Sequence, residues 1–258
     1  MSWNKELSVS KIAAYLAGKE INKIYERDFD IEYKNDNSPL TEADMVANKI
    51  IVEMLRREFP TYAILSEEEK DNKKRLENDY CFIVDPLDGT KEFIKRNGQF
   101  TVNIALAYKH RTVMGVIYVP VTGEMYYAAQ GEGAWVSDKN GQIKKLHVSD
   151  TINIEEIRLV MSSSHTCEQM EELIKKYHFN NFVKMGSSLK GCLVAKGDAE
   201  VYYRYNPTME WDTAAMQCIA AEAGAIVRQM DDSELLYNRE NSLNDKGFYI
   251  INRMENRI

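Results

Sequence analysis

Two aspartates, Asp85 and Asp88, stand three residues apart in the stretch YCFIVDPLDGT at residues 80–90. The apolar first half of this stretch predicts a buried strand, and its proline and glycine predict that regular structure ends just beyond the strand. Two carboxylates in such a turn repel each other by about 4 kcal/mol at about 4 Å and an effective dielectric constant near 20. A hard cation would cancel this repulsion. An acidic surface turn is the alternative, and it fits less well because this turn follows an apolar strand.

Other acids stand at the ends of predicted elements and could join this pair. Glu67 follows the predicted strand at residues 62–66, and Asp212 opens a predicted helix at residues 211–224. An acid at a helix start is, taken alone, an ordinary cap. Asp44, in the first turn of a helix that starts near residue 41, would taken alone simply complement the helix dipole. These candidate metal ligands are all carboxylates, with no cysteine or histidine among them. An oxygen-only ligand set of this kind favours Mg²⁺ over zinc. Two such ions sharing carboxylates would form a site for phosphoryl chemistry.

The elements that position these acids fall into two halves. In the first half, the sequence predicts helices over residues 3–25 and from about residue 41, and a short strand at residues 29–34. It also predicts a solvated loop at residues 69–78 and a loop with basic and aromatic residues at residues 91–100. Four alternating segments then predict an antiparallel meander in one sheet with the strand at residues 80–84: residues 101–109, 112–120, 123–130 and 133–138. A strand at residues 143–148 closes the half.

The second half alternates strands and helices from residue 158 to residue 251, which predicts a mixed, largely wound sheet. The polar segment at residues 149–156 is the best boundary, so we expect an N-terminal half at residues 1–150 with most of the metal ligands. Residues 151–258 would carry the substrate contacts and the last metal ligand. We expect an α/β (α+β) protein whose layers follow one another in the order helices, sheet, helices, sheet and helices.

Composition excludes several classes of protein. The 258 residues include 40 acids and 33 bases, a net charge of −7 without a basic tract, which argues against nucleic-acid polymers as partners. No apolar run is long enough for a signal peptide core or a membrane span. The four cysteines, without paired spacing, predict reduced core thiols in a cytoplasmic protein. The sequence leaves open a homodimer and a peripheral contact with the inner membrane.

Five motifs resemble the Mg²⁺-dependent, lithium-sensitive phosphatases of the inositol monophosphatase superfamily, across nearly the whole chain. They are PLTEAD at residues 39–44, LSEE at residues 65–68, DPLDGTKEFIKRNGQFTVNIAL at residues 85–106, GSSLK at residues 186–190 and WDTAA at residues 211–215. Lys91 and Glu92 after DPLDGT resemble the bacterial 3′(2′),5′-bisphosphate nucleotidase branch, because inositol phosphatases usually carry TNF there. The chain departs from that branch at residues 162–165, where it has SSSH and the branch often has SRSH. It also has Met216 where a glycine often follows WDTAA, which we expect to affect helix packing only.

The resemblance implies a layered α-β-α-β-α fold and a role for each acid. Glu67, Asp85 and the carbonyl of Leu87 would hold one Mg²⁺, and Asp85, Asp88 and Asp212 a second. Thr90 would activate the attacking water, with Asp44 as its hydrogen-bond partner and as a contact for a third ion. The amides of Gly89 and Thr90 would receive the phosphate. The residues implied to contact a bisphosphate nucleotide, beside Asp212, are His165, Ser187, Lys190 and Arg204.

Two other functions remain as alternatives to a nucleotidase that hydrolyses adenosine 3′,5′-bisphosphate to AMP and phosphate. An inositol or sugar monophosphatase would share the metal acids. A catalytically silent sensor of bisphosphate nucleotides would be expected to have lost a metal acid or Thr90, and all of these residues are present. Lys190, Arg204 and His165 could instead be solvated charges and a helix cap.

Overall fold

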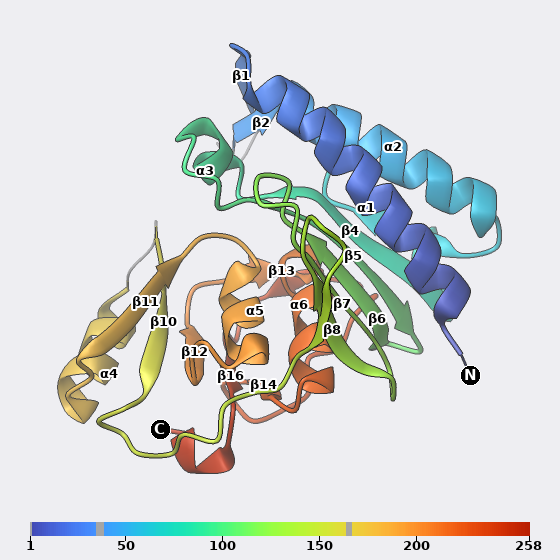
Figure 1. Cartoon of the computed structure of the whole chain (residues 1–258). Coiled ribbons are helices and arrows are strands. Elements are labelled where there is room, and N and C mark those ends of the chain that lie inside the picture. The colour runs from blue at the N-terminus through green and yellow to red at the C-terminus, as the bar shows by residue number, and fades with distance from the viewer. Residues whose placement is uncertain (1, 35–38, 164–166) are drawn as a thin grey trace.

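The structure is a computed structural model that describes residues 2–34, 39–163 and 167–258. Its elements stack in the expected order of helices, sheet, helices, sheet and helix (Figure 1). Helices α1 and α2 cover one face of the larger sheet, α5 and α6 lie between the two sheets, and α4 covers the outer face of the smaller sheet. The helices are α1 (Asn4–Tyr25), α2 (Glu42–Glu58), α3 (Thr90–Ile94), α4 (Glu168–Tyr177), α5 (Leu189–Lys196) and α6 (Glu210–Glu222).

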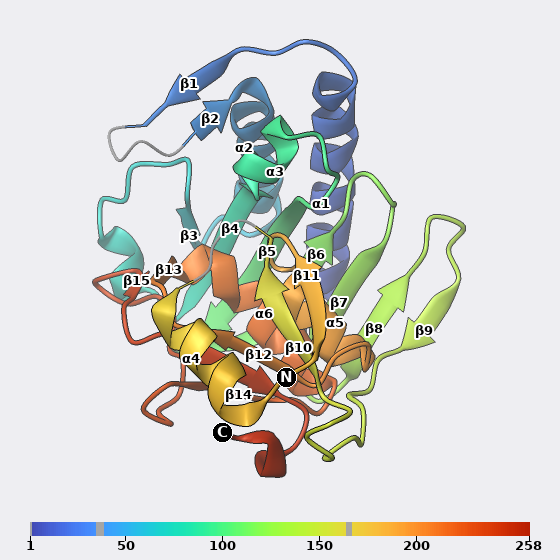
Figure 2. The ribbon, with the colours of Figure 1, turned by 90° about the vertical axis from the view of Figure 1, so that its left-hand side faces the viewer.

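The larger sheet has seven strands in the order β3-β4-β5-β6-β7-β8-β9. Only β3 and β4 run parallel, and the remaining neighbours are antiparallel, which confirms the predicted meander. Figure 2 shows these strands side by side. Their bounds are β3 (Ala63–Ser66), β4 (Tyr80–Asp88), β5 (Thr101–Tyr108), β6 (Arg111–Tyr118), β7 (Met125–Ala129), β8 (Gly133–Ser137) and β9 (Ile143–Lys145).

The smaller sheet has five strands in the order β11-β10-β12-β16-β14. Strand β10 runs parallel to both of its neighbours, and β16 runs antiparallel to both of its own, so the sheet is mixed as predicted. The strands are β10 (Arg158–Ser162), β11 (Asn181–Met185), β12 (Val201–Arg204), β14 (Ile226–Gln229) and β16 (Phe248–Ile251). Two further pairs are β1 (Ile31–Tyr33) with β2 (Pro39–Thr41), and β13 (Thr208–Met209) with β15 (Leu243–Asn244).

Helix α6 packs tightly on the larger sheet where Ala215 meets Gly115 in β6. A Cβ atom added to Gly115 in β6 would lie 2.6 Å from the carbonyl oxygen of Ala215, so a larger residue would push the helix away. One buried apolar cluster joins this helix to residues of both sheets, among them Ile83 and Ile250. The division of the chain at residues 150 and 151 therefore remains a prediction, since this core is shared between the two halves.

Three expectations about local structure are wrong. Strand β4 does not end at residue 84 but continues through the proline to Asp88. The expected loop at residues 91–100 begins with the short helix α3. The charged segment at residues 69–78 is not simply solvated, because it forms a 3₁₀ helix, η1 (Lys74–Glu77), in which Arg75 is buried.

One cysteine differs from its expected position. Cys167 is half-exposed and precedes α4, whereas the other three cysteines are buried free thiols as predicted. Among the residues that the structure describes, no helix has the length and apolar character needed to cross a membrane.

Candidate active site

Strand β4 brings Asp85 and Asp88 to the same place by means of an irregularity in its pairing with β5. Asp85 pairs with Asn103 and Asp88 pairs with Thr101, so three steps along β4 oppose two along β5. Side chains three residues apart on a regular strand point to opposite faces, and one extra residue returns the second to the face of the first. The proline within this bulge is tolerated because the pairing of β4 with β3 ends at Val84.

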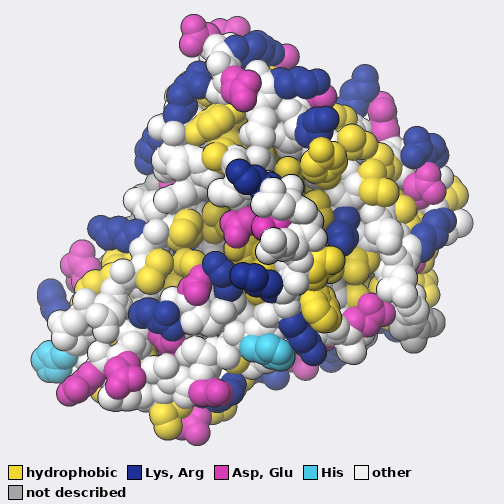
Figure 3. All heavy atoms as spheres, viewed as in Figure 1, with side chains coloured by type: hydrophobic (Ala, Val, Ile, Leu, Met, Phe, Trp, Pro, Cys, Tyr) yellow, Lys and Arg dark blue, Asp and Glu magenta, His cyan; other side chains and the backbone are white. Residues whose placement is uncertain are grey.

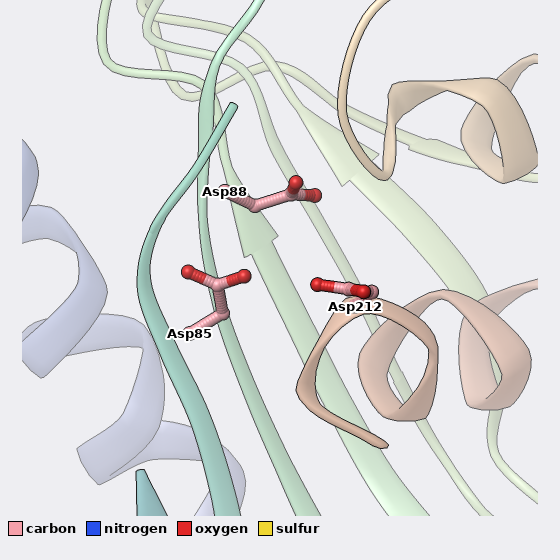
Figure 4. Close-up of side chains that lie close together, drawn as sticks. All are labelled: Asp85, Asp88 and Asp212. Carbon is pink, nitrogen blue, oxygen red and sulfur yellow. The ribbon is translucent and has the colours of Figure 1, made fainter. Parts of the chain in front are cut away.

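The start of helix α6 supplies the third acid. Asp212 accepts a hydrogen bond from the backbone N–H of Met209 at 2.7 Å, which fixes the side chain across the first turn. One oxygen from each of Asp85, Asp88 and Asp212 lies within 4.8 Å of the others. The three carboxylates come from β4 and α6 and point toward a common space (Figure 4). We call these three residues the acid cluster.

Burial and mutual repulsion make the charged forms of these carboxylates costly in the absence of a cation. Burial, with the charges of Glu67, Asp88 and Asp212, raises the pKa of Asp85 well above its usual value. Burial and the charge of Asp88 raise the pKa of Asp212 to about 7. A divalent cation would relieve both effects, and the donors are carboxylate oxygens, the ligands that Mg²⁺ and Mn²⁺ prefer. The chemistry of the donor set therefore fits a hard metal ion.

Asp88 is oriented by residues that the sequence did not single out. Its Oδ2 atom accepts hydrogen bonds from the backbone N–H and the hydroxyl of Ser188, both at 2.6 Å, and from the Asn103 amide at 3.1 Å. Asn103 also donates to the Ser188 hydroxyl at 2.8 Å. Ser188 thus contacts the acid cluster, while its neighbour Ser187 remains the serine of GSSLK that is expected to contact substrate.

The expected hydrogen bond between Thr90 and Asp44 is present. The Thr90 hydroxyl lies 3.1 Å from Oδ1 of Asp44 and 3.3 Å from the carbonyl oxygen of Leu87, and it can donate to either. The other oxygen of Asp44 accepts the N–H and the hydroxyl of Thr41 at 2.8 and 2.6 Å, which ties the carboxylate to the start of α2. Burial raises the pKa of Asp44.

Gly89, at the N-cap of α3, has φ of +96°, which a side chain would strain, so glycine suits this position.

Glu67 lies at the same edge of the sheet but has a different partner. Its backbone N–H donates to the carbonyl oxygen of Val84 at 3.1 Å, which places it where β4 leaves β3. Its carboxylate accepts a hydrogen bond from the Lys34 ammonium at 2.8 Å, and Lys34 also contacts Glu68 at 2.6 Å. Burial raises the pKa of Glu67, with Lys34 opposing the shift. The sequence did not indicate this lysine, which comes from the distant β1 segment.

A cavity of about 440 Å³ opens next to the acid cluster, within the range of small-molecule sites. Acidic side chains gather near the middle of this face, with Lys and Arg side chains on either side of them (Figure 3). The predicted site residues that line the cavity are Glu67, Asp88, Gly89, Thr90, Ser187, Lys190, Arg204 and Asp212.

Lys190 and Arg204, the two basic side chains expected to contact substrate, each donate a hydrogen bond to a backbone carbonyl oxygen. Lys190 is buried, which lowers the pKa of its ammonium to about 8, and it donates to the carbonyl oxygen of Ser187. Nε of Arg204 donates to the carbonyl oxygen of Asn206 at 3.2 Å. Met216 lines the cavity as well as packing on α5, which goes beyond the expected effect on helix packing. His165 lies outside the described residues.

Comparison with known proteins assigns the chain to a class of phosphatases. The sequence pattern of the inositol monophosphatase family matches residues 3–253. The chain belongs to the inositol monophosphatase family.

The chain is also similar to individual members of this family. The chain is 43% identical over 237 residues to the 3′(2′),5′-bisphosphate nucleotidase CysQ of Salmonella typhimurium, covering 91% of this chain and 94% of the relative. The corresponding CysQ of Escherichia coli K12 is 41% identical over the same length. The crystal structure of CysQ from Bacteroides thetaiotaomicron superposes with a TM-score of 0.84 at 41% identity, covering 96% of this chain and 98% of that one. An IMPase from Thermotoga maritima superposes with a TM-score of 0.79 at 25% identity.

Proposed function

We propose that this protein is a Mg²⁺-dependent 3′(2′),5′-bisphosphate nucleotidase that hydrolyses adenosine 3′,5′-bisphosphate to AMP and phosphate. The observation that carries the proposal is the acid cluster next to a cavity that Lys190 and Arg204 also line. The acids suit cations that receive the phosphate to be cleaved, and the bases suit a second phosphate. The names of the CysQ relatives support the same substrate class.

The proposed metal ligands divide between two ions. Glu67, Asp85 and the Leu87 carbonyl would hold one ion, and the acid cluster would hold the other, so that Asp85 contacts both. Asp44 is a candidate contact for a third ion. Bound Mg²⁺ would neutralise phosphate charge and lower the pKa of water, which allows hydrolysis near neutral pH. To complete this set, Glu67 would exchange the Lys34 ammonium for a metal ion.

The residues of the chain perform the remaining steps by positioning and proton transfer. Thr90 would orient the attacking water through its hydroxyl and pass a proton toward Asp44, whose Oδ1 it already contacts. The backbone amides of Gly89 and Thr90 would receive the phosphate, as the family resemblance implies. Phosphoryl transfer needs mainly such positioning and charge neutralisation, without covalent participation of the protein.

Specificity for bisphosphates would come from the basic side chains that line the same cavity. Lys190 would bind the uncleaved phosphate as a point charge, and Arg204 could bind it with two parallel hydrogen bonds. Ser187, in the turn before α5, also lines this cavity. We retain a cytoplasmic location and a homodimer as predictions that await measurement.

A substrate panel tests the assignment. Phosphate release should be fastest with adenosine 3′,5′-bisphosphate, slower with inositol 1-phosphate, and lost when EDTA replaces Mg²⁺. A preference for inositol 1-phosphate would favour the monophosphatase alternative. Binding of the bisphosphate without release of phosphate at any Mg²⁺ concentration would favour the silent sensor.

A further inference from the structure

A buried polar network lies next to the first turn of α6, which carries Asp212, and joins three separate parts of the chain. Its central members are Arg75 in η1, Glu210 at the first position of α6, and Asn238 in the segment between β14 and β15. They are 4%, 0% and 2% exposed. We call these three residues the rear network. None of the three was singled out by the sequence or used in the proposed reaction.

Arg75 is the cation of the network. Its Nε and Nη2 atoms donate to one oxygen of Asp71, at 3.1 and 2.9 Å. Its Nη1 donates to the side-chain oxygen of Asn238 at 2.9 Å, and Nη2 donates to the carbonyl oxygen of Arg239 at 2.8 Å. A guanidinium is suited to this task because its planar fork fixes several acceptors at once, whereas a lysine ammonium cannot.

Asn238 connects Arg75 to Glu210 through hydrogen bonds. Its amide nitrogen donates to the carbonyl oxygens of Arg75 and Asn78, at 3.1 and 3.2 Å. Its backbone N–H donates to one carboxylate oxygen of Glu210 at 2.6 Å, and the N–H of Arg239 donates to the other at 3.0 Å. The backbone N–H of Glu210 donates to the carbonyl oxygen of Ser242 at 2.9 Å. The first residue of α6 is thus held through both its side chain and its main chain.

The position of Glu210 connects the network to the acid cluster. Asp212 follows two residues later, in the same turn of α6, and its carboxylate must face Asp85 and Asp88 across a gap within 4.8 Å. Arg75 belongs to the connection between β3 and β4, which begins with Glu67 and leads into the strand that carries Asp85. The rear network therefore links the turn that carries Asp212 to the part of the chain that supplies the other acids.

We propose that Arg75 and Glu210 are positioning residues that, through Asn238, set the orientation of Asp212 in the acid cluster and so the affinity of the cluster for its cation. This inference rests on the proposed function, because it requires the acid cluster to bind a divalent ion. Outer contacts of this kind typically change metal affinity by about 10- to 100-fold when they are removed.

The variant that tests this is Glu210→Gln, which keeps the shape of the side chain but turns an NH₂ group toward one of the two backbone N–H donors. The chain contains a matched control in Glu200, which is also 0% exposed. Glu200 accepts the backbone N–H of Arg158 at 2.7 Å and the Ser149 hydroxyl at 2.8 Å. It precedes β12 at the end opposite Arg204, so Glu200→Gln removes a comparable buried carboxylate away from the cavity.

The measurement is Mn²⁺ binding to the full-length protein, followed by the electron paramagnetic resonance signal of free Mn²⁺, with the melting temperature of each variant. Glu210→Gln should weaken the binding of one Mn²⁺ about 10- to 100-fold. It should also raise the half-saturating Mg²⁺ concentration for hydrolysis by a similar factor. Glu200→Gln should lower the melting temperature and leave Mn²⁺ affinity within about twofold, because it breaks hydrogen bonds away from the cluster.

A loss of melting temperature in Glu210→Gln with unchanged Mn²⁺ affinity would overturn the inference, since the network would then serve only the fold. Arg75→Lys, which keeps the charge but loses the fork, should show the same weakening to a smaller degree and carries the test if Glu210→Gln does not fold. Failure of the proposed function looks different: wild type and Asp85→Asn would then bind Mn²⁺ equally.

Discussion

Replacing Asp212 with asparagine should stabilise the metal-free protein. Burial and the charge of Asp88 raise the pKa of Asp212 from 3.8 to about 7, a shift of about three units. At 1.36 kcal/mol per unit, this corresponds to about 4 kcal/mol of folding free energy at pH 8. Coulomb's law gives a similar scale, about 3.5 kcal/mol for one pair of carboxylates 4.8 Å apart at an effective dielectric constant of 20. The asparagine oxygen can still accept the N–H of Met209.

The sign and the pH window follow from proton linkage. Because the pKa is higher in the folded protein, the folded state binds the proton more tightly, and the wild type loses stability as pH rises from about 4 to about 7. The Asp212→Asn variant has no ionisable group at this position, so it does not lose folding stability in this way. Its advantage should be about 4 kcal/mol at pH 8 and about 2 kcal/mol at pH 5, as the same linkage requires.

The assay is thermal melting of both proteins in EDTA at pH 5 and pH 8. For a chain of this size, about 4 kcal/mol corresponds to a melting temperature about 8 to 16 °C higher in the variant at pH 8. Mg²⁺ at 100 times the dissociation constant should narrow this difference, because the wild type gains about 2.7 kcal/mol and the variant, which lacks a ligand, gains less.

A control variant should shift in the opposite direction. Burial would raise the pKa of Glu200, but hydrogen bonds from Arg158 outweigh burial and lower it. A lowered pKa stabilises the fold above the unfolded pKa, so Glu200→Gln should melt below the wild type at pH 8. Coincident melts of wild type and Asp212→Asn at pH 8 would refute the repulsion on which the acid cluster depends.

Three further predictions concern activity. Thr90→Val should lower kcat about 100- to 10,000-fold with little change in the Mg²⁺-induced rise in melting temperature, and Thr90→Ser should recover most of the loss; an unchanged kcat would remove Thr90 from proton transfer. Lys190→Ala should lower kcat/KM about 10- to 150-fold for adenosine 3′,5′-bisphosphate and at most about threefold for inositol 1-phosphate, whereas equal losses would assign Lys190 to the fold or the metal site. LiCl should inhibit at concentrations where KCl does not, since Li⁺ resembles Mg²⁺ in size with half its charge; equal inhibition at constant ionic strength would reduce the effect to screening.

The regular elements and the main acids could be predicted because their signals are local. Alternation of apolar residues defined the meander, and the apolar run before Asp85 defined a buried strand. Acids at the carboxyl ends of the parallel strands β3 and β4 had to converge, because such ends meet at one edge of a sheet. These features depend on spacing within a few residues and on simple rules of topology.

The missing parts depend on partners distant in sequence. The bulge at Asp85 and Asp88 is a property of the pairing with β5, which a single strand does not reveal. Arg75 stands in a charged stretch that indicates a solvated loop, and its burial depends on Asn238, 163 residues later. The contact of Ser188 with Asp88 and of Lys34 with Glu67 likewise arises only when distant segments pack together.

The central claim is that hydrolysis depends on a cation bound at Asp85. The most direct test is the rate of phosphate release from adenosine 3′,5′-bisphosphate by wild type and by Asp85→Asn, each titrated with Mg²⁺ after EDTA treatment. Wild type should be inactive without Mg²⁺ and saturate as Mg²⁺ is added, and Asp85→Asn should remain inactive throughout while melting at or above the metal-free wild type. Turnover by Asp85→Asn, or by the wild type in EDTA, would contradict the account.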